Sequence, residues 1–569
     1  MSIEIIDANH HLSDIECHFK VFAGPGAGKT RFLVNHIRNV LNNSQRLQIC
    51  RKIACITFTN VATETILKRA GDHGGRLEIS TIHSFLYKYI VKPYVHLIAD
   101  EYDLKAEAID GHDDILFSGY QFLKEWKSTT AQTYLDDGDI ASAFERLRWK
   151  FDGNGDLAPL PPYPQKSGKY NFKPDSYWIY KRMVWKKGLL HHDDILFFSH
   201  QIIKKLPFAL EVLRAQFPYF IVDEFQDTSP IQIEILRLIG QKETIVGIVG
   251  DEAQSIYKFL GAVPGQLKAF TLPGMKLFEI KDNHRSSNQI VDLLNKIRPT
   301  LYQDAKRGES HTSITMVIGD KAAALQWTEA THAGRQVVSL CRENLTANSL
   351  KKGIAASIQK NLLIELKEKD GNSTRRRAVS NATKAVENAR MGYFKDALKT
   401  IEKLFNYKKS DLDKKRSLKC LKLLLDNYSQ YSGKKVIDLY NLLNNEGTML
   451  LSKLSKGAAK TFYETTEYDF MAAAVKNLYE AGNHRTIHKS KGEEFETVLL
   501  VLDKDEKGQF NEMAELSFFL KPDLENDEEH RIKYVAISRP RNHLVISAPS
   551  ISAHNIPAIE KLGINIQIL

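Results

Sequence analysis

The sequence is poor in the features that mark secreted, membrane-bound and disulfide-rich proteins. Only 5 of its 569 residues are cysteine, and no two of them form a Cys-x-x-Cys pair. This spacing argues against a disulfide framework, a zinc ribbon and an iron–sulfur cluster, and it fits a reducing compartment. No apolar run reaches the ~18 residues of a membrane span, and the polar, acidic N-terminus is unlike a signal peptide. We therefore expect a cytoplasmic protein with no membrane partner.

The composition is that of a globular protein too long for a single core. Hydrophobic residues make up 43% of the chain and charged residues 26%. The net charge of +10 permits a polyanionic partner, although many basic proteins bind no nucleic acid.

The most informative stretch reads Val-Phe-Ala-Gly-Pro-Gly-Ala-Gly-Lys-Thr from Val21 to Thr30. An apolar run precedes it and an apolar helical pattern follows it, which is the order of a phosphate-binding loop. Its glycines let the backbone N–H groups face inward, and the start of the helix adds positive charge. Lys29 is placed to reach terminal phosphates, and Thr30 to bind Mg²⁺. The predicted nucleotide-binding residues are Ala23, Gly24, Pro25, Gly26, Ala27, Gly28, Lys29 and Thr30, with Ala23 in place of the usual first glycine.

A second site is predicted where the apolar run at 219–222 ends in Asp223 and Glu224. Such a pair, taken alone, is commonly a strand end with two solvated acids. Together with the phosphate loop it predicts an ATPase. Asp223 would then bind Mg²⁺, and Glu224 would polarise the attacking water.

Apolar strands alternate with helices in two parts of the chain, which predicts an α/β fold with two parallel sheets. The expected strands lie at 52–58, 77–81, 219–222 and 244–249 in the first part, and at 314–318, 336–341, 497–502 and 543–547 in the second. The expected domains are a first α/β domain at 1–88 and 189–275 with a mainly helical insertion at 89–188, and a second at 276–350 and 483–569 with a helical, Lys-rich insertion at 351–482.

Two polar clusters have simpler interpretations than a binding site. The His-His-Asp-Asp segment at 191–194 lacks a further ligand cluster with metal-site spacing, so we expect it to cap the helix that follows. Three arginines at 375–377 are expected to form a solvated face rather than a DNA contact.

Further motifs follow one another in a fixed order. They are Ile56–Asn60, Ser80–Phe85, Asp223–Asp227, Gly250–Tyr257, Asn283–Ser286, Thr486–Phe495 and Tyr534–Arg539. This ordered set resembles the superfamily 1 helicases of the UvrD/Rep/PcrA type, with Gly-Asp-x-x-Gln-Ser-Ile-Tyr as the most specific element. The resemblance implies two RecA-like domains with ATP in the cleft between them, each carrying an insertion, and 3′ to 5′ translocation on single-stranded DNA.

The resemblance also assigns roles to single residues. Gln254 matches the residue that senses the γ-phosphate, and Arg285 and Arg539 match the arginines that stabilise the charge on that phosphate. Glu494 resembles the residue that contacts the ribose and couples the cleft to DNA. Arg31 matches a residue near the base.

The DNA contacts implied by the resemblance are of two kinds. Phe58 and Phe259 match positions that stack on bases, although Trp is usual at the second, and Tyr257 is a neighbouring candidate. The positions that match backbone contacts, each of which could instead be a helix cap or a core polar residue, are Thr59, Asn60, His83, Thr486 and His488.

Departures from the family pattern leave alternatives open. The adenine-reading glutamine upstream of the loop is missing, since the first glutamine is Gln45. The insertion at 351–482 is shorter than the family's duplex-contacting subdomain, and no fused nuclease domain is expected after the last motif. These departures motivate a second hypothesis, a DNA- or nucleotide-sensing ATPase subunit that regulates a separate nuclease, similar to the helicase components of anti-phage systems such as Gabija. A third hypothesis is an RNA helicase, but the Gln-Ser-Ile-Tyr block favours the DNA branch.

Overall fold

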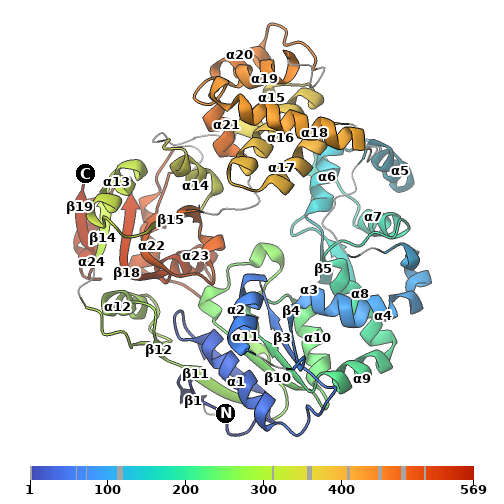
Figure 1. Ribbon diagram of the computed structural model, residues 1–569, viewed down its shortest axis with the longest axis vertical. Helices are drawn as coiled ribbons and strands as arrows, with labels where there is room; N and C mark the ends of the chain where they lie inside the picture. Colours follow the sequence, from blue (N-terminus) through green and yellow to red (C-terminus); the bar gives the residue numbers. More distant parts are fainter. Residues whose placement is uncertain are drawn as a thin grey trace. The chain divides into compact units, whose positions relative to one another are not determined.

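Two compact units make up the chain, Met1–His284 and Arg285–Leu569. Each contains one large parallel sheet (Figure 1). The computed structural model describes residues 3–58, 60–71, 74–109, 111, 119–310, 313–354, 362–405, 411–445, 451–475, 482–504 and 508–569, without the side chains of residues 60, 61, 411, 412 and 445. Across these described ranges, no helix has the length and apolar character that a membrane crossing demands.

The sheet of the first unit has seven parallel strands in the order β1-β11-β2-β10-β9-β3-β4. Its central strands are runs of buried apolar residues, as expected for strands covered on both faces. Helices α1 and α2 pack on one face, and α8, α9 and α10 pack on the other. The bounds are β1 (Ile3–Ile6), β2 (Phe19–Ala23), β3 (Ile53–Thr57), β4 (Leu77–Thr81), β9 (Tyr219–Val222), β10 (Ile245–Gly250), β11 (Lys276–Ile280), α1 (Lys29–Asn43), α2 (Asn60–Ala70), α8 (Asp194–Lys205), α9 (Pro207–Gln216) and α10 (Pro230–Gly240). The four strands expected in this part of the chain are confirmed.

The boundary between the two α/β parts differs from the one expected at residue 276. Lys276–Ile280 forms β11, which lies between β1 and β2 of the first sheet. Parallel strands pair through non-local connections, so the position of a strand in the sheet leaves no local pattern in the sequence. The first compact unit therefore extends to His284.

The insertion expected at 89–188 is mainly helical in its described residues, and it also contains two antiparallel hairpins. Trp126 lies at the centre of a core shared by its three longer helices. Its elements, with the short helices that lead into it, are α3 (Ile82–Leu86), η1 (Tyr87–Val91), α4 (Lys92–Tyr94), η2 (Val95–Leu97), η3 (Ala99–Tyr102), η4 (Ala106–Ala108), α5 (Tyr120–Thr130), α6 (Asp137–Glu145), β5 (Arg148–Phe151), β6 (Leu157–Leu160), β7 (Lys166–Ser167), β8 (Tyr170–Asn171) and α7 (Asp175–Trp185).

A buried carboxylate joins this insertion to α8. Asp194 is fully buried and accepts hydrogen bonds from the indole nitrogens of Trp149 and Trp185 at 2.9 and 3.0 Å. It also pairs with Lys181 Nζ at 2.6 Å. The expected capping role of the His-His-Asp-Asp segment is wrong, because the N-cap residue Asp193 makes no side-chain capping hydrogen bond and its carboxylate points into a cavity. The segment instead anchors the insertion through Asp194.

The sheet of the second unit has six parallel strands in the order β16-β15-β17-β18-β14-β19. The four strands expected here are confirmed. The bounds are β14 (Ile314–Ile318), β15 (Val337–Cys341), β16 (His484–Thr486), β17 (Phe495–Val501), β18 (Pro540–Ala548), β19 (Asn565–Ile568), α12 (Asn288–Ile297), α13 (Lys321–Thr331), α14 (Asn344–Lys351), α22 (Glu512–Leu520), α23 (Glu528–Ile537) and α24 (Ile556–Glu560).

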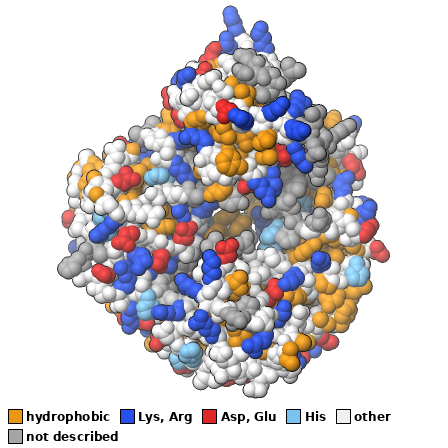
Figure 2. All heavy atoms as spheres, viewed as in Figure 1, with side chains coloured by type: hydrophobic (Ala, Val, Ile, Leu, Met, Phe, Trp, Pro, Cys, Tyr) orange, Lys and Arg blue, Asp and Glu red, His pale blue; other side chains and the backbone are white. Residues whose placement is uncertain are grey.

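The block at 351–482 is helical in its described residues, as expected. It carries 26 Lys and Arg against 15 Asp and Glu, a net charge of +11, whereas the whole chain has a net charge of +10. Lys and Arg side chains project from it at the top of Figure 2. Its helices are α15 (Leu362–Lys369), α16 (Ser373–Arg390), α17 (Phe394–Glu402), α18 (Asp411–Asp426), α19 (Val436–Asn445), α20 (Ala458–Thr465) and α21 (Tyr468–Ala474).

The solvated face expected for the three arginines at 375–377 is wrong for the first of them. Arg375 is buried, and its Nε donates to the Asp370 carboxylate at 2.8 Å. The Tyr463 hydroxyl donates to the same carboxylate at 3.0 Å. A buried charge needs such partners. Half-buried Arg376 donates to the Asp370 carbonyl at 2.6 Å, and only Arg377 is exposed.

Candidate nucleotide and nucleic-acid site

The predicted phosphate-binding loop lies between β2 and α1. Gly26 and Gly28 have φ values of 72° and 85°, the left-handed region that glycine adopts without steric cost. A Cβ on Gly28 would lie 2.7 Å from the Ala8 Cβ, so the loop passes the N-terminal segment too closely for a side chain. The Asn283 side-chain amide donates to the Pro25 carbonyl at 3.0 Å, which ties the loop to the end of the first unit.

The groups of this loop fit a phosphate ligand. Lys29 Nζ lies 3.3 Å from the carbonyl oxygens of both Ala23 and Gly24. Charged phosphate oxygens bind an ammonium group more strongly than two neutral carbonyls do. Lys29 would therefore exchange the two carbonyls for the oxygens of a bound triphosphate. Thr30 lies in the first turn of α1, which carries no acidic residue and whose N–H groups favour an anion. Arg31 follows on the exposed side.

The two predicted carboxylates stand at the same sheet edge as the loop. They follow β9, which is separated from β2 only by β10, and all three strands are parallel. Asp223 is buried, and one of its oxygens accepts the backbone N–H of Glu224 at 2.9 Å. Glu224 has φ 51° and ψ 42°, a conformation that costs energy outside glycine and is found at functional sites.

A chain of hydrogen bonds connects Glu224 to Gln254. The Gln226 side-chain amide donates to the Glu224 carboxylate, and its oxygen accepts the backbone N–H of Asp251 at 2.9 Å. The Gln254 side-chain amide donates to the Asp251 carboxylate at 2.6 Å. Gln226 and Asp251 were not predicted as site residues. They occur inside two of the quoted motifs, but only the fold shows that they bridge β9 and β10.

In the second unit, Glu494 holds two arginines. Its carboxylate lies 3.1 Å from Arg285 Nε and 3.5 Å from Arg541. Arg285 also donates to the Ser538 carbonyl at 3.0 Å. Glu494, the predicted ribose contact, and Arg285, a predicted phosphate contact, are therefore paired with each other in this structure.

Arg539 is 1% exposed and lies under the end of α23. Its Nε donates to the Val535 carbonyl and its Nη2 to the Ser538 hydroxyl, both at 2.9 Å. A phosphate contact by Arg539 would require the side chain to leave these acceptors.

Three predicted stacking residues share one surface of the first unit. The rings of Phe58 and Tyr257 stack at a centroid distance of 4.7 Å and an angle of 20°. Phe259 is 57% exposed and meets Tyr257 edge-on at 5.9 Å. Exposed aromatic faces of this kind suit the stacking of unpaired bases.

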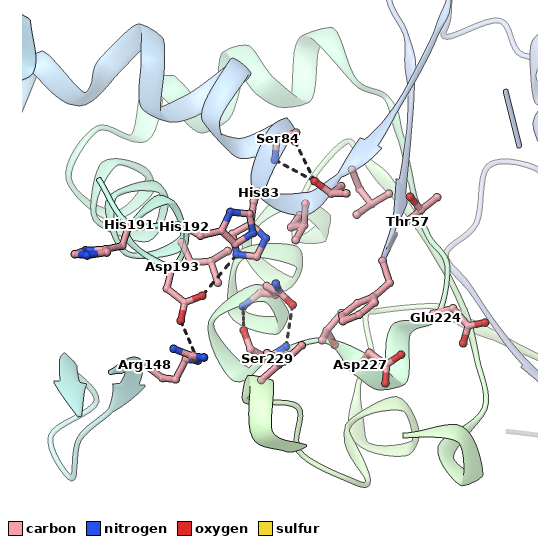
Figure 3. A pocket seen from close by; sticks show the side chains of 18 of the residues that line it. Thr57, His83, Ser84, Arg148, His191, His192, Asp193, Glu224, Asp227 and Ser229 are labelled. Atoms are coloured by element: carbon pink, nitrogen blue, oxygen red, sulfur yellow. Dashed lines mark hydrogen bonds and ion pairs between the residues drawn. The ribbon is translucent and has the colours of Figure 1, made fainter. Parts of the chain in front are cut away.

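A cavity of about 800 Å³ opens at the carboxyl ends of β3, β4 and β9. Phe58 and Glu224 line it, and so does His83, whose ring stacks on that of His192 at 3.8 Å. Figure 3 shows the two histidines at one end of the cavity and Glu224 at the other. The cavity thus places a predicted DNA contact and a predicted catalytic carboxylate in one space.

The remaining predicted DNA contacts are distributed over both units. Thr486 is buried at the start of η9 (Ile487–Ser490), which contains half-buried His488. Asn60 begins α2, and Thr59 lies outside the described residues.

Two family models match the sequence of this chain. The UvrD/REP helicase N-terminal domain matches residues 7–272, and the UvrD-like helicase C-terminal domain matches residues 354–550. The chain belongs to the UvrD/Rep family of helicases. The parallel sheets of its two units agree with the RecA-like fold that the resemblance implies.

The relatives of this UvrD/Rep-family chain are distant in sequence. It is 24% identical to the "Putative ATP-dependent DNA helicase YjcD" of Bacillus subtilis, over 95% of this chain and 78% of that protein. It is 24% identical to DNA helicase II of Rickettsia typhi, over 93% of this chain and 89% of the relative. The match to the ATP-dependent DNA helicase Rep of Buchnera aphidicola, at 27% identity, covers 49% of this chain and 41% of Rep.

Proposed function

We propose that this chain is an ATP-dependent DNA helicase that translocates 3′ to 5′ on single-stranded or tailed duplex DNA. The observation that carries the proposal is the hydrogen-bonded path from Glu224 to Gln254 beside the phosphate loop. A phosphate cradle, a water-orienting carboxylate and a phosphate-sensing amide are the parts that nucleoside triphosphate hydrolysis requires. DNA as the substrate is supported by the names of the relatives.

The loop residues 23–30 would bind the triphosphate, and Thr30 and Asp223 would hold Mg²⁺. Mg²⁺ typically takes one or two protein ligands and completes its shell with substrate phosphates and water. The bound ion would neutralise charge on the phosphate oxygens, while Glu224 orients the attacking water.

Arg285 and Arg539 would stabilise the charge that develops as the γ-phosphate leaves, and Gln254 would sense its presence. Both arginines are held by groups of their own unit, so hydrolysis requires them to exchange these partners for phosphate. Glu494 would bind the ribose once it releases Arg285, and Arg31 would lie near the base. This exchange gives a physical route by which nucleotide binding changes the second unit.

The proposed DNA path in the first unit runs over the aromatic surface and along the cavity. Phe58, Tyr257 and Phe259 would stack on bases, and His83 would contact the backbone. In the second unit Thr486 and His488 would contribute backbone contacts, and Asn60 and Thr59 would do so in the first. Stacking is tolerant of sequence, so we expect little base preference.

The test is ATP hydrolysis by the full chain with and without an oligothymidylate, followed by strand separation on duplexes with a 3′ or a 5′ single-stranded tail. We expect strong stimulation by DNA and separation of the 3′-tailed duplex only. Lys29→Ala should abolish both activities, with Lys92→Ala, a lysine outside the site, as its control. Normal hydrolysis by Lys29→Ala would refute the site assignment.

The second candidate is a DNA-responsive ATPase subunit that regulates a separate nuclease. The observation that favours it is the short helical block at 351–482. The matches to two Rep helicases cover about half of this chain and about two fifths of each Rep protein. This candidate predicts DNA-stimulated hydrolysis without strand separation until a partner from the native host is added. Co-purification from that host distinguishes the two candidates.

A further inference from the structure

The cavity beside His83 is polarised. Figure 3 shows His83, His192 and Arg148 at one end, and Glu224 and Asp227 toward the other. His83 lies in α3, directly after β4, His192 precedes α8, and Arg148 begins β5 of the insertion. Three elements thus bring basic side chains to the end of the cavity that lies farthest from the predicted catalytic carboxylate.

The carboxylate of Asp193 faces two of the basic groups at this end. One oxygen of Asp193 lies 3.9 Å from His83 Nε2, and the other lies 3.5 Å from Arg148 Nε. The rings of His83 and His192 stack directly beside it. The side chains of Asp193 and Arg148 are 27% and 30% exposed, so the group can be reached from the cavity.

The neighbouring carboxylate shows how differently Asp193 is held. Asp194 receives N–H donors at 2.6 to 3.1 Å from four groups and is fully buried. Charge-assisted hydrogen bonds normally span 2.7–2.9 Å, so both ion pairs of Asp193 are too long to be tight. Burial raises the pKa of Asp193 in spite of the opposing effect of Arg148. Its negative charge is therefore weakly compensated.

We propose that the Asp193 carboxylate occupies the position of a DNA backbone phosphate and competes with DNA for His83 and Arg148. A phosphate that enters the cavity would displace it and bind both groups. Arg148, from the insertion, and His192, from the segment before α8, then become nucleic-acid contacts. The inference rests on the proposed function, since it requires that the chain bind single-stranded DNA.

The expected effect follows from like-charge repulsion. A carboxylate and a phosphate within about 5 Å repel at an effective dielectric constant between those of protein and water. Removing this charge while keeping the shape should tighten binding about tenfold. Asp193→Asn is suitable because the residue makes no capping bond that the substitution would break.

The experiment measures binding of the full chain to a fluorescently labelled oligothymidylate by anisotropy across a salt series. Asp193→Asn should lower Kd about tenfold. Asp137→Asn removes the same charge from a Lys127 ion pair in the insertion, outside the cavity, and should leave Kd unchanged. Arg148→Gln should weaken binding and flatten the slope of log Kd against log salt by about 0.7, the value for one phosphate on a single strand. In the double variant Asp193→Asn/Arg148→Gln, most of the gain should disappear.

The outcomes distinguish a failure of the proposed function from a failure of the competition between Asp193 and DNA. If the unmodified chain does not bind the oligothymidylate, the proposed function fails. If it binds and Asp193→Asn has an unchanged or higher Kd, the competition is refuted, and a higher Kd identifies Asp193 as a residue that positions His83. A normal salt slope for Arg148→Gln would also refute the phosphate contact. If Asp193→Asn does not fold, the affinity and the salt slope of Arg148→Gln still test whether this cavity binds a DNA phosphate.

Discussion

The side-chain oxygen of Gln226 accepts the backbone N–H of Asp251 at 2.9 Å, although the two residues follow different strands. The space for this contact depends on Gly250, where an added Cβ would lie 2.4 Å from the same oxygen. Because the Gln226 amide also donates to Glu224, one side chain orients the predicted water-binding carboxylate and the turn that carries Gln254.

Replacing Gln226 by Met should therefore slow hydrolysis without abolishing nucleotide binding. The change keeps the shape and removes both hydrogen bonds, so Glu224 and the Asp251 turn lose their common support. We expect kcat to fall about tenfold to a hundredfold, as misplaced catalytic groups do, while KM for ATP changes little. The control is Gln201→Met in α8, which removes the acceptor of a hydrogen bond that the Tyr102 hydroxyl donates. An unchanged kcat would show that Gln226 has no positioning role.

Gly28→Ala should prevent nucleotide binding. At φ 85° an L-residue costs about 1–2 kcal/mol, and the new Cβ would also meet the Ala8 Cβ at 2.7 Å. Gly274→Ala is the matched control, since Gly274 has φ 71° but no atom of the described residues lies within 4 Å of the added Cβ. The rise in melting temperature on adding ATP should be lost in Gly28→Ala and retained in Gly274→Ala. Equal responses of the two variants would mean that the close approach to Ala8 is unimportant.

Local sequence patterns predict the parts of this fold that have local causes. Strands such as Tyr219–Val222 and Ile314–Ile318 are short buried apolar runs between turns, and the phosphate loop combines glycine, lysine and threonine at fixed spacing. The role of Lys276–Ile280 could not be predicted, because its place between β1 and β2 depends on pairing with distant segments.

In the site, too, local sequence patterns predict some residues but not the contacts between distant segments. The predicted residues of the phosphate loop and of the β9 end lie at one sheet edge because parallel strands bring their carboxyl ends together. The bridging role of Gln226 depends on the strand order, and the burial of Asp194 depends on two tryptophans from the insertion. Neither relationship has a fixed sequence spacing, so a motif cannot indicate it.

Asp194→Asn should destabilise the first unit strongly. It would leave the Lys181 ammonium group, which is 5% exposed, without its counter-charge. Breaking a buried pair from one side typically costs about 3–5 kcal/mol. We expect a lower urea midpoint by circular dichroism, a partial recovery in Asp194→Asn/Lys181→Met, and almost no change in the more exposed pair variant Asp137→Asn. A midpoint equal to that of the unmodified chain would show that Asp194 does not anchor the insertion.

His36 should make the first unit sensitive to mild acid. Its ring packs against the rings of Phe19 and Phe32, its ring nitrogens have no hydrogen-bond partner among the described residues, and burial lowers its pKa to about 4. An unfolded histidine takes up its proton near pH 6.5, so between about pH 6.5 and 4 the unfolded chain binds more protons and stability falls as the pH is lowered.

This one group accounts for a loss of about 2 kcal/mol at pH 5. His36→Phe removes the titration while keeping an aromatic ring, so the drop in melting temperature between pH 7 and pH 5 should be smaller than in the unmodified chain. Part of the drop should remain, because burial also lowers the pKa of His200 and His543 to about 4. The control is His96→Phe at an exposed position, which should show the same drop in melting temperature as the unmodified chain. Identical drops in His36→Phe and the unmodified chain would show that the buried ring does not control acid stability.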